Sequence, residues 1–159
     1  MRDEYQLEKT VWTEKDFEQM GWHDATVHAF AYEPDRAEFV LDLDYILEWV
    51  RPDATHFTFW SAPATLVFKD VAELAIELSP FPGFELSDIN RDDPQSADAP
   101  DQLLESLHWR WTLGFFDGRI TFRAAGYTQY IRRTPIANTS QSLTLEDRGG
   151  ISFARPESL

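Results

Sequence analysis

A long stretch in which apolar and polar residues alternate constrains the fold more than any other feature of the sequence. It spans residues 25–33 and 38–49, and the intervening residues 34–37 (Pro-Asp-Arg-Ala) have the composition of a turn. Since successive side chains of a strand point to opposite faces, the pattern predicts an antiparallel hairpin with Glu33 opposite Glu38. One face is then apolar, as a core face must be, with His28 on it. The pairs on that face are Tyr32 with Phe39, Phe30 with Leu41, His28 with Leu43 and Thr26 with Tyr45.

The opposite face of this hairpin is small and apolar except for two carboxylates. Asp42 and Asp44 are two residues apart on one strand, so both point the same way with their Cα atoms about 7 Å apart. Such a pair can hold a hard cation or share a proton, and it can equally be the solvent side of a strand. No further oxygen ligands follow at a recognisable spacing, so we predict no metal site and no cofactor.

Three shorter alternating segments follow. Residues 55–60, 64–69 and 71–78 each have a strand pattern, and Pro63 predicts a bend or a sheet edge between the first two. Residues 79–102 change character, with four prolines and five aspartates, and they are interpreted as a long acidic loop.

The last third contains the clearest hairpin signal. Leu107–Phe116 and Arg119–Tyr127 flank Asp117-Gly118, which predicts a two-residue type I′ turn and a buried face. Residues 127–133 are expected to continue as a strand after a kink at Gly126, and residues 142–146 to add a last short strand before a frayed end. The residues expected on the buried face are Trp109, Trp111, Leu113, Phe115, Ile120, Phe122, Ala124 and Gly126.

One short helix is predicted near the start. Thr13 offers an N-cap hydroxyl, Asp16 follows three residues later as in a capping box, and Gly21 suits the position after the last turn. The helix is expected over residues 14–20. With no crossover helices for a parallel sheet, residues 1–159 are predicted to form one mainly β (β-rich α+β) domain, an antiparallel meander folded as a sandwich or a partly open barrel.

Composition excludes several classes of protein. The absence of cysteine removes disulfides, thiolate metal sites and a cysteine nucleophile. The formal net charge of 14 − 28 = −14 argues against nucleic acid as the main partner. Residues 1–106 hold 7 basic and 24 acidic side chains, whereas residues 107–159 hold 7 and 4, which weakens that argument for the last hairpin. The start is acidic and no window resembles a membrane span, so a cytoplasmic protein is expected.

Candidate site residues gather at the polar and aromatic positions of the first half. Trp22-His23-Asp24 follows the helix. His23 with Asp24 is either an acid–base pair or half of a metal site, or else Asp24 caps or orients a turn while Trp22 packs. Neighbouring residues of a strand point to opposite faces, so the two polar side chains need not act together. Trp49 and Trp60 either line a ligand groove or belong to the core. No nucleophile elbow, phosphate loop or dinucleotide fingerprint is present, so no catalytic residue is assigned and an enzyme is not favoured.

Several of these segments carry a resemblance. Trp22-His23-Asp24, the run Leu41-Asp42-Leu43-Asp44-Tyr45-Ile46 and the run from Phe59 to Phe68 resemble a group of small, uncharacterised bacterial proteins. The early His-Asp pair and the strands after it are also similar to the immunity protein 50 family of toxin-neutralising bacterial proteins. That resemblance implies a protein that binds and blocks a toxin, and an acidic surface suits a basic partner.

Three hypotheses about function follow. The first is a non-enzymatic binding protein of toxin-immunity type. The alternative is a small-molecule-binding or hydrolytic β-domain with a site around His23, Asp24, Asp42 and Asp44. The third is a homodimer formed through sheet edges.

Overall fold

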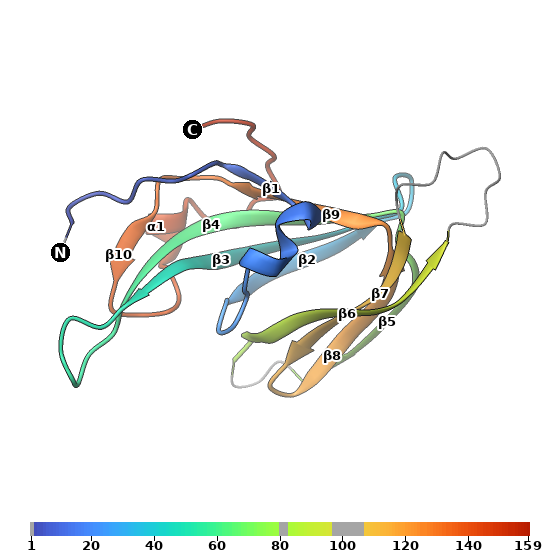
Figure 1. The fold of residues 1–159 in the computed structure, drawn as a ribbon, viewed down its shortest axis with the longest axis horizontal. Helices are drawn as coiled ribbons and strands as arrows, with labels where there is room; N and C mark the ends of the chain where they lie inside the picture. The colour runs from blue at the N-terminus through green and yellow to red at the C-terminus, as the bar shows by residue number, and fades with distance from the viewer. Residues whose placement is uncertain (1, 80–82, 97–106) are drawn as a thin grey trace.

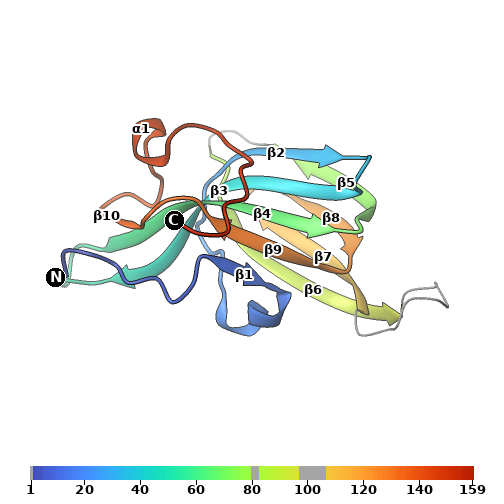
Figure 2. The same cartoon turned by 90° about the horizontal axis from the view of Figure 1, so that it is seen from above.

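The computed structural model describes residues 2–79, 83–96 and 107–159, which form two antiparallel sheets (Figures 1 and 2). The strand order is β1-β9-β4-β3-β2 in the first sheet, with β10 also paired to β4, and β5-β8-β7-β6 in the second. The prediction of a mainly β, antiparallel fold is confirmed. The strands are β1 (Val11–Thr13), β2 (Val27–Glu33), β3 (Glu38–Val50), β4 (Thr58–Lys69), β5 (Ala72–Leu78), β6 (Leu86–Ser96), β7 (Leu107–Phe115), β8 (Gly118–Ala124), β9 (Gly126–Ile131) and β10 (Ile136–Asn138).

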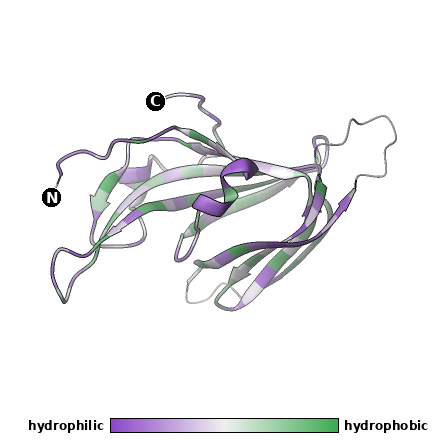
Figure 3. Ribbon diagram, in the orientation of Figure 1, coloured by the Kyte–Doolittle hydropathy of each residue, from purple (hydrophilic) through white to green (hydrophobic). Residues whose placement is uncertain are grey.

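The two sheets enclose one apolar core. Apolar and polar residues alternate along the strands of the second sheet, as expected when one face is buried (Figure 3). Trp111 is fully buried, and its ring packs edge-on against Phe68 and Tyr127 of the first sheet. At one side the sheets are also joined by backbone bonds between residues 24–27 and 84–86, so the sandwich is partly closed there.

The chain is not a simple meander. It leaves the first sheet after β4, builds β5 to β8 in the second sheet, and returns to the first sheet as β9. The return follows Ala125, next to the kink expected at Gly126. Strands distant in sequence, β4 and β9, therefore become neighbours, with Leu66 paired to Gln129.

The β2–β3 hairpin has the predicted register from Ala29 to Glu38, but the prediction for His28 is wrong. A bulge between Val27 and Ala29 places Val27 opposite Leu43. Because the extra residue reverses the faces on either side of it, His28 leaves the apolar face and turns towards Asp44.

Pro63 does not end a strand as predicted, because β4 runs through it. The Pro63 carbonyl accepts a hydrogen bond from Arg132 N–H at 2.9 Å, so the nitrogen of Pro63 faces the same neighbouring side of the sheet. On that side β10 pairs with residues 59–61 and β9 with residues 64–69. The proline lies at the junction between these two neighbours, where no ladder hydrogen bond from its nitrogen is needed.

The β7–β8 hairpin buries the predicted face but turns one residue earlier than expected. Phe115 pairs with Gly118, so Phe116 and Asp117 form the loop. Gly118 has φ +132, and a Cβ atom there would lie 2.0 Å from the Glu77 carbonyl oxygen. Glycine is therefore required by the close approach of β5 and not by a type I′ turn.

The acidic loop predicted over residues 79–102 is wrong for residues 86–96, which form β6 and pair with β7. Residues 80–82 and 97–102 lie outside the described residues. β6 is an edge strand, and an edge tolerates Pro94 and a series of aspartates because only one side of it is paired.

The helical segments differ in part from the predictions. The first is a 3-10 helix, η1 (Glu14–Gln19), with the expected capping box between Thr13 and Asp16. The strand predicted at 142–146 is wrong, because Thr144 caps a short helix there, α1 (Leu145–Arg148). The last residues do not fray but return to the first sheet, where Thr65 Oγ1 donates to the Ala154 carbonyl at 2.6 Å.

Candidate binding surface

Asp42 and Asp44 are fully buried and belong to an ionic cluster, defined here as these two carboxylates with His28, Arg132 and Arg148. Arg148 donates to Asp42 Oδ1 at 2.7 Å, to Asp42 Oδ2 at 2.9 Å and, through Nε, to Asp44 Oδ1 at 3.0 Å. Arg132 donates to Asp42 Oδ1 at 2.7 Å, and the His28 ring lies 2.7 Å from Asp44 Oδ2. Two aspartates and two arginines thus balance each other in the interior.

The ionic cluster attaches the C-terminal segment, residues 139–159, to the outer face of the first sheet. Backbone N–H groups of Leu143 and Ser152 donate to Asp44 and Asp42 at 2.9 and 3.0 Å. Burial raises the pKa of Asp42, but the hydrogen bonds from Arg148, Ser152 and Arg132 outweigh it and lower the pKa overall. Both carboxylates therefore have a structural role, which a strand face open to solvent would not give them.

Trp22 is buried and Asp24 lies in a turn, as one of the interpretations of this segment predicts. The strand geometry assumed for His23 and Asp24 is wrong, so their side chains are not directed to opposite faces. Asp24 has φ +63, and this left-handed conformation brings its Oδ2 to 3.6 Å from His23 Nε2. Gln141 of the C-terminal segment donates to Asp24 at 2.7 Å, and His23 Nδ1 lies 2.9 Å from the Ser87 carbonyl. The turn is thus held by the C-terminal segment on one side and by β6 of the second sheet on the other.

Beyond this turn β3 and β4 continue past the second sheet as an arm, residues 45–61, with β10 beside it (Figures 1 and 2). One face of the arm carries an aromatic surface made of His23, Trp49, Phe57 and Phe59. Trp49 is paired with Phe59 across the strands at a ring distance of 5.1 Å, and it stacks on His23 at 6.0 Å. Trp49 is 42% exposed and Phe57 43% exposed. Large aromatic side chains left this accessible next to one another are typical of binding sites.

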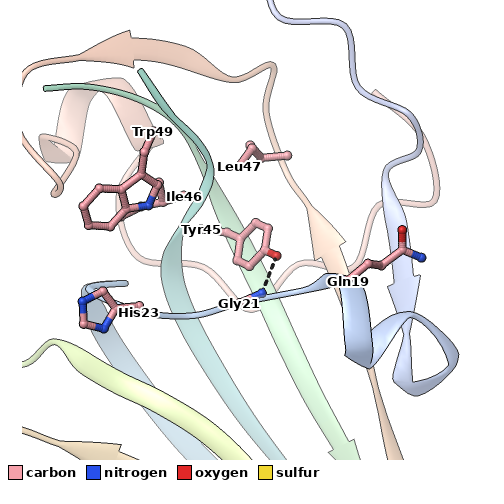
Figure 4. A pocket seen from close by; sticks show the side chains of 7 residues that line it. All are labelled: Gln19, Gly21, His23, Tyr45, Ile46, Leu47 and Trp49. Carbon is pink, nitrogen blue, oxygen red and sulfur yellow. Dashed lines mark hydrogen bonds between the residues drawn. The ribbon is translucent and has the colours of Figure 1, made fainter. Parts of the chain in front are cut away.

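A pocket of about 450 Å³ borders the aromatic surface (Figure 4). It lies between β3 and the segment that follows η1, and the Tyr45 hydroxyl spans its wall by accepting a hydrogen bond from Gly21 N–H at 3.3 Å. Burial raises the pKa of Tyr45, so this hydroxyl stays neutral. The lining residues are Gln19, Gly21, His23, Tyr45, Ile46, Leu47 and Trp49.

A second hollow of about 490 Å³ lies on the other side of Phe57 and Phe59, against residues 139–141. The turn at the tip of the arm is held by Asp53, which accepts hydrogen bonds from Thr55 N–H and Oγ1 at 2.7 Å. These bonds and the contact with His56 lower the pKa of Asp53 to about 2. The aromatic surface is thus carried by a structured arm with a hollow on each side.

The structure separates the six residues singled out from the sequence into three places. His23, Asp24 and Trp49 meet at the aromatic surface, whereas Asp42 and Asp44 lie in the ionic cluster. Trp60 points to the opposite face of the arm, where its ring packs 5.7 Å from Tyr5. Sequence reasoning did not single out Phe57, which lies at the aromatic surface, although its alternation with Phe59 was visible.

The arginines of the last hairpin do not form a free basic face. Arg110 and Arg123 approach Glu73 of β5 at 3.7 and 3.5 Å, and Arg123 also pairs with Asp93 of β6. Arg119 lies 3.8 Å from Glu77. Acidic side chains of the two edge strands therefore neutralise the positive charge that the sequence places on β7 and β8.

Within residues 2–79, 83–96 and 107–159, no three His, Asp or Glu side chains are grouped so that they could hold a metal ion. No helix in the same part of the chain is long and apolar enough to cross a membrane. Comparison of the chain with protein-family models, curated proteins and solved structures finds no match. The resemblance to the immunity protein 50 family accordingly stays a prediction.

Proposed function

We propose that this protein is a non-enzymatic binding protein of toxin-immunity type, and that it binds a basic protein partner through the aromatic surface. The observation that carries the proposal is the exposed pair Trp49 and Phe57, held rigidly by Phe59 and His23. Aromatic side chains contribute large contact areas at a small cost in conformational entropy, so they commonly anchor protein interfaces.

The buried carboxylates support a binding role over a hydrolytic one. A hydrolase built on Asp42 and Asp44 needs one of them free to accept a proton or to attack a substrate. Both are instead saturated by arginine and backbone N–H donors inside the ionic cluster. Before either carboxylate could take part in hydrolysis, Arg148 and the C-terminal segment would have to move away from it.

The charge of the chain supports a basic partner. At a formal net charge of −14, a positively charged protein is attracted over several ångströms before contact and associates faster. A toxin that acts on nucleic acid carries such positive charge, because phosphate binding needs it.

A small-molecule ligand is the second candidate, and the pocket beside Trp49 favours it. Its volume is in the range of ligand sites, and His23 and Gln19 supply polar groups at its rim. Neither Asp42 nor Asp44 lines this pocket. A small-molecule site here would therefore use His23 and not those two carboxylates.

The experiment is co-expression with the product of each adjacent gene, scored by growth; for a product that is toxic alone, the Kd of the purified pair is then measured. Trp49→Ala is expected to weaken binding at least 10-fold and to abolish protection. Tyr32→Ala is the matched control, since Tyr32 is 43% exposed at the other end of the same hairpin. Equal loss in both variants, or full protection by Trp49→Ala, contradicts the proposed function.

A further inference from the structure

β3 is longer than its neighbour β2, and this leaves part of its edge open. The last backbone bond between them runs from Asp44 N–H to the Thr26 carbonyl at 2.9 Å. β3 continues to Val50, paired on its other side with β4 up to Thr58. Among the residues that the structure describes, residues 45–50 have no strand beside them on the β2 side. These six residues are called the open edge.

Proteins usually protect such an edge with lysine, proline or a covering segment. The open edge carries a single charged residue, Glu48, which forms a salt bridge with Arg2. The segment after η1 passes nearby, but its backbone contact with this part of β3 is one bond to the Tyr45 hydroxyl, and the 450 Å³ pocket separates the two. The edge is therefore bordered by a cavity where a covering strand would be expected (Figure 4).

The pocket and the edge together have the layout of a strand-addition site. In such sites the backbone of an extended peptide pairs with a sheet edge, and alternate side chains enter a neighbouring pocket. Here Tyr45, Ile46 and Leu47 of the open edge form one wall of the pocket, and Trp49 closes one end. An apolar side chain of an added strand would lie between this wall and His23.

We propose that the open edge accepts an extended, positively charged segment of a protein partner as an additional antiparallel or parallel strand. The proposal rests on the proposed function, and it specifies how the partner is held. The backbone of residues 45–50 provides the pairing, the pocket takes an apolar side chain, and flanking carboxylates attract lysine or arginine.

Local charge decides which occupant fits. A smaller hollow of about 280 Å³ shares Gly21 and His23 with the pocket, and Glu18 and Asp88 line it. Glu18 is 89% exposed at its side chain and lies 3.8 Å from Arg91, and Asp24 lies 3.6 Å from His23. A second copy of the chain would bring the same carboxylates and a further −14 to this place, whereas a basic strand neutralises them.

The probe is a displayed library of random octapeptides, selected on the full chain and counter-selected on a Leu47→Lys variant. Lysine at the edge is expected to repel a basic strand and to block pairing. The matched control is Ile76→Lys, which places the same charge on β5, the exposed edge strand of the second sheet. Selected peptides are expected to be net positive with apolar residues at alternate positions. They should bind the control like the parent chain and the Leu47→Lys variant at least 10-fold more weakly.

Hydrogen exchange of the bound chain then locates the peptide. Slowed exchange at the amides of residues 45–50 supports the proposal. Acidic peptides, no enriched peptide, or protection elsewhere overturns it, and so does concentration-dependent self-association through this edge. These results are separable from the proposed function, because loss of toxin binding in Trp49→Ala with normal binding by Leu47→Lys removes strand addition alone.

Discussion

Replacing Arg148 by methionine tests whether the ionic cluster holds the fold together. Methionine is similar in length to arginine but carries no charge and no donor. The change removes three hydrogen bonds to Asp42 and Asp44 and one to the Gly150 carbonyl, at a side chain with no exposed surface. Two carboxylates are then left in the interior with Arg132 and His28 as their remaining side-chain partners.

The expected cost is about 3–5 kcal/mol, the range for removing one partner of a buried ion pair. Domains of this kind have a free energy of unfolding of about 5–15 kcal/mol, so about a fifth or more of the stability is lost. At roughly 2–4 °C per kcal/mol for a chain of this length, Tm falls by about 6–20 °C. Tryptophan fluorescence during urea unfolding measures the change, with the denaturant midpoint shifting at constant slope.

Arg119→Met is the matched control. Its guanidinium is 63% exposed and 3.8 Å from Glu77, so the expected cost is about 0–1 kcal/mol. Adding Asp44→Asn to Arg148→Met removes one stranded charge and is expected to recover part of the loss. Residues 139–159 should also exchange their amide hydrogens faster in Arg148→Met. A loss below about 1 kcal/mol, with unchanged exchange, would refute the assignment of the cluster as the anchor of this segment.

Three further predictions follow from single residues. Hydrogen bonds outweigh burial and lower the pKa of Asp42 below 3.8 in the folded chain. The ionised carboxylate therefore contributes its full stabilisation above pH 3.8, and this contribution is lost as the pH falls through the folded-state pKa. In urea unfolding at different pH values, Asp42→Asn should show a weaker dependence of the free energy of unfolding on acid. Gly118→Ala is expected to cost about 1–3 kcal/mol because of its φ of +132 and the contact with Glu77, whereas Gly21→Ala, with nothing within 4 Å, should stay within about 0.5 kcal/mol. The Asp53 carboxyl should titrate at about 2 by NMR, and Thr55→Val should raise that pKa towards 3.8.

Most strands could be predicted because their signal is local. Alternation over residues 38–49 and a turn composition at 34–37 specify β3 and its hairpin without reference to the rest of the chain. β6 could not be predicted from its local sequence, because its aspartates and Pro94 are typical of a loop. Only its position at the edge of a sheet makes those residues tolerable, and sheet order is not a local property.

The contacts of the candidate site residues could not be predicted for the same reason, because they are not local in the sequence. Two aspartates set into an apolar strand face were visible as an anomaly, but their partners Arg132 and Arg148 lie about 90 and 106 residues further along the chain. No spacing rule connects residues that meet only when β9 and the C-terminal segment fold onto β3 and β4. The His23–Asp24 contact was misjudged for a different reason, since one left-handed residue reverses the expected divergence of neighbouring side chains.

The distribution of positive charge bears on what this protein can bind. Six of the seven basic residues after residue 106 are in salt bridges, three across the second sheet and three with Asp42, Asp44 or Glu38. The excess of basic residues in this part of the sequence therefore does not become an unpaired basic surface, because carboxylates from other strands neutralise it. Of the carboxylates around the aromatic surface and the open edge, Glu18 lies 3.8 Å from Arg91, Asp24 lies 3.6 Å from His23, and Asp88 is exposed. A partner that carries lysine or arginine on an extended segment can pair with the unpaired backbone of β3 and approach the exposed carboxylates beside it, Glu18 and Asp88.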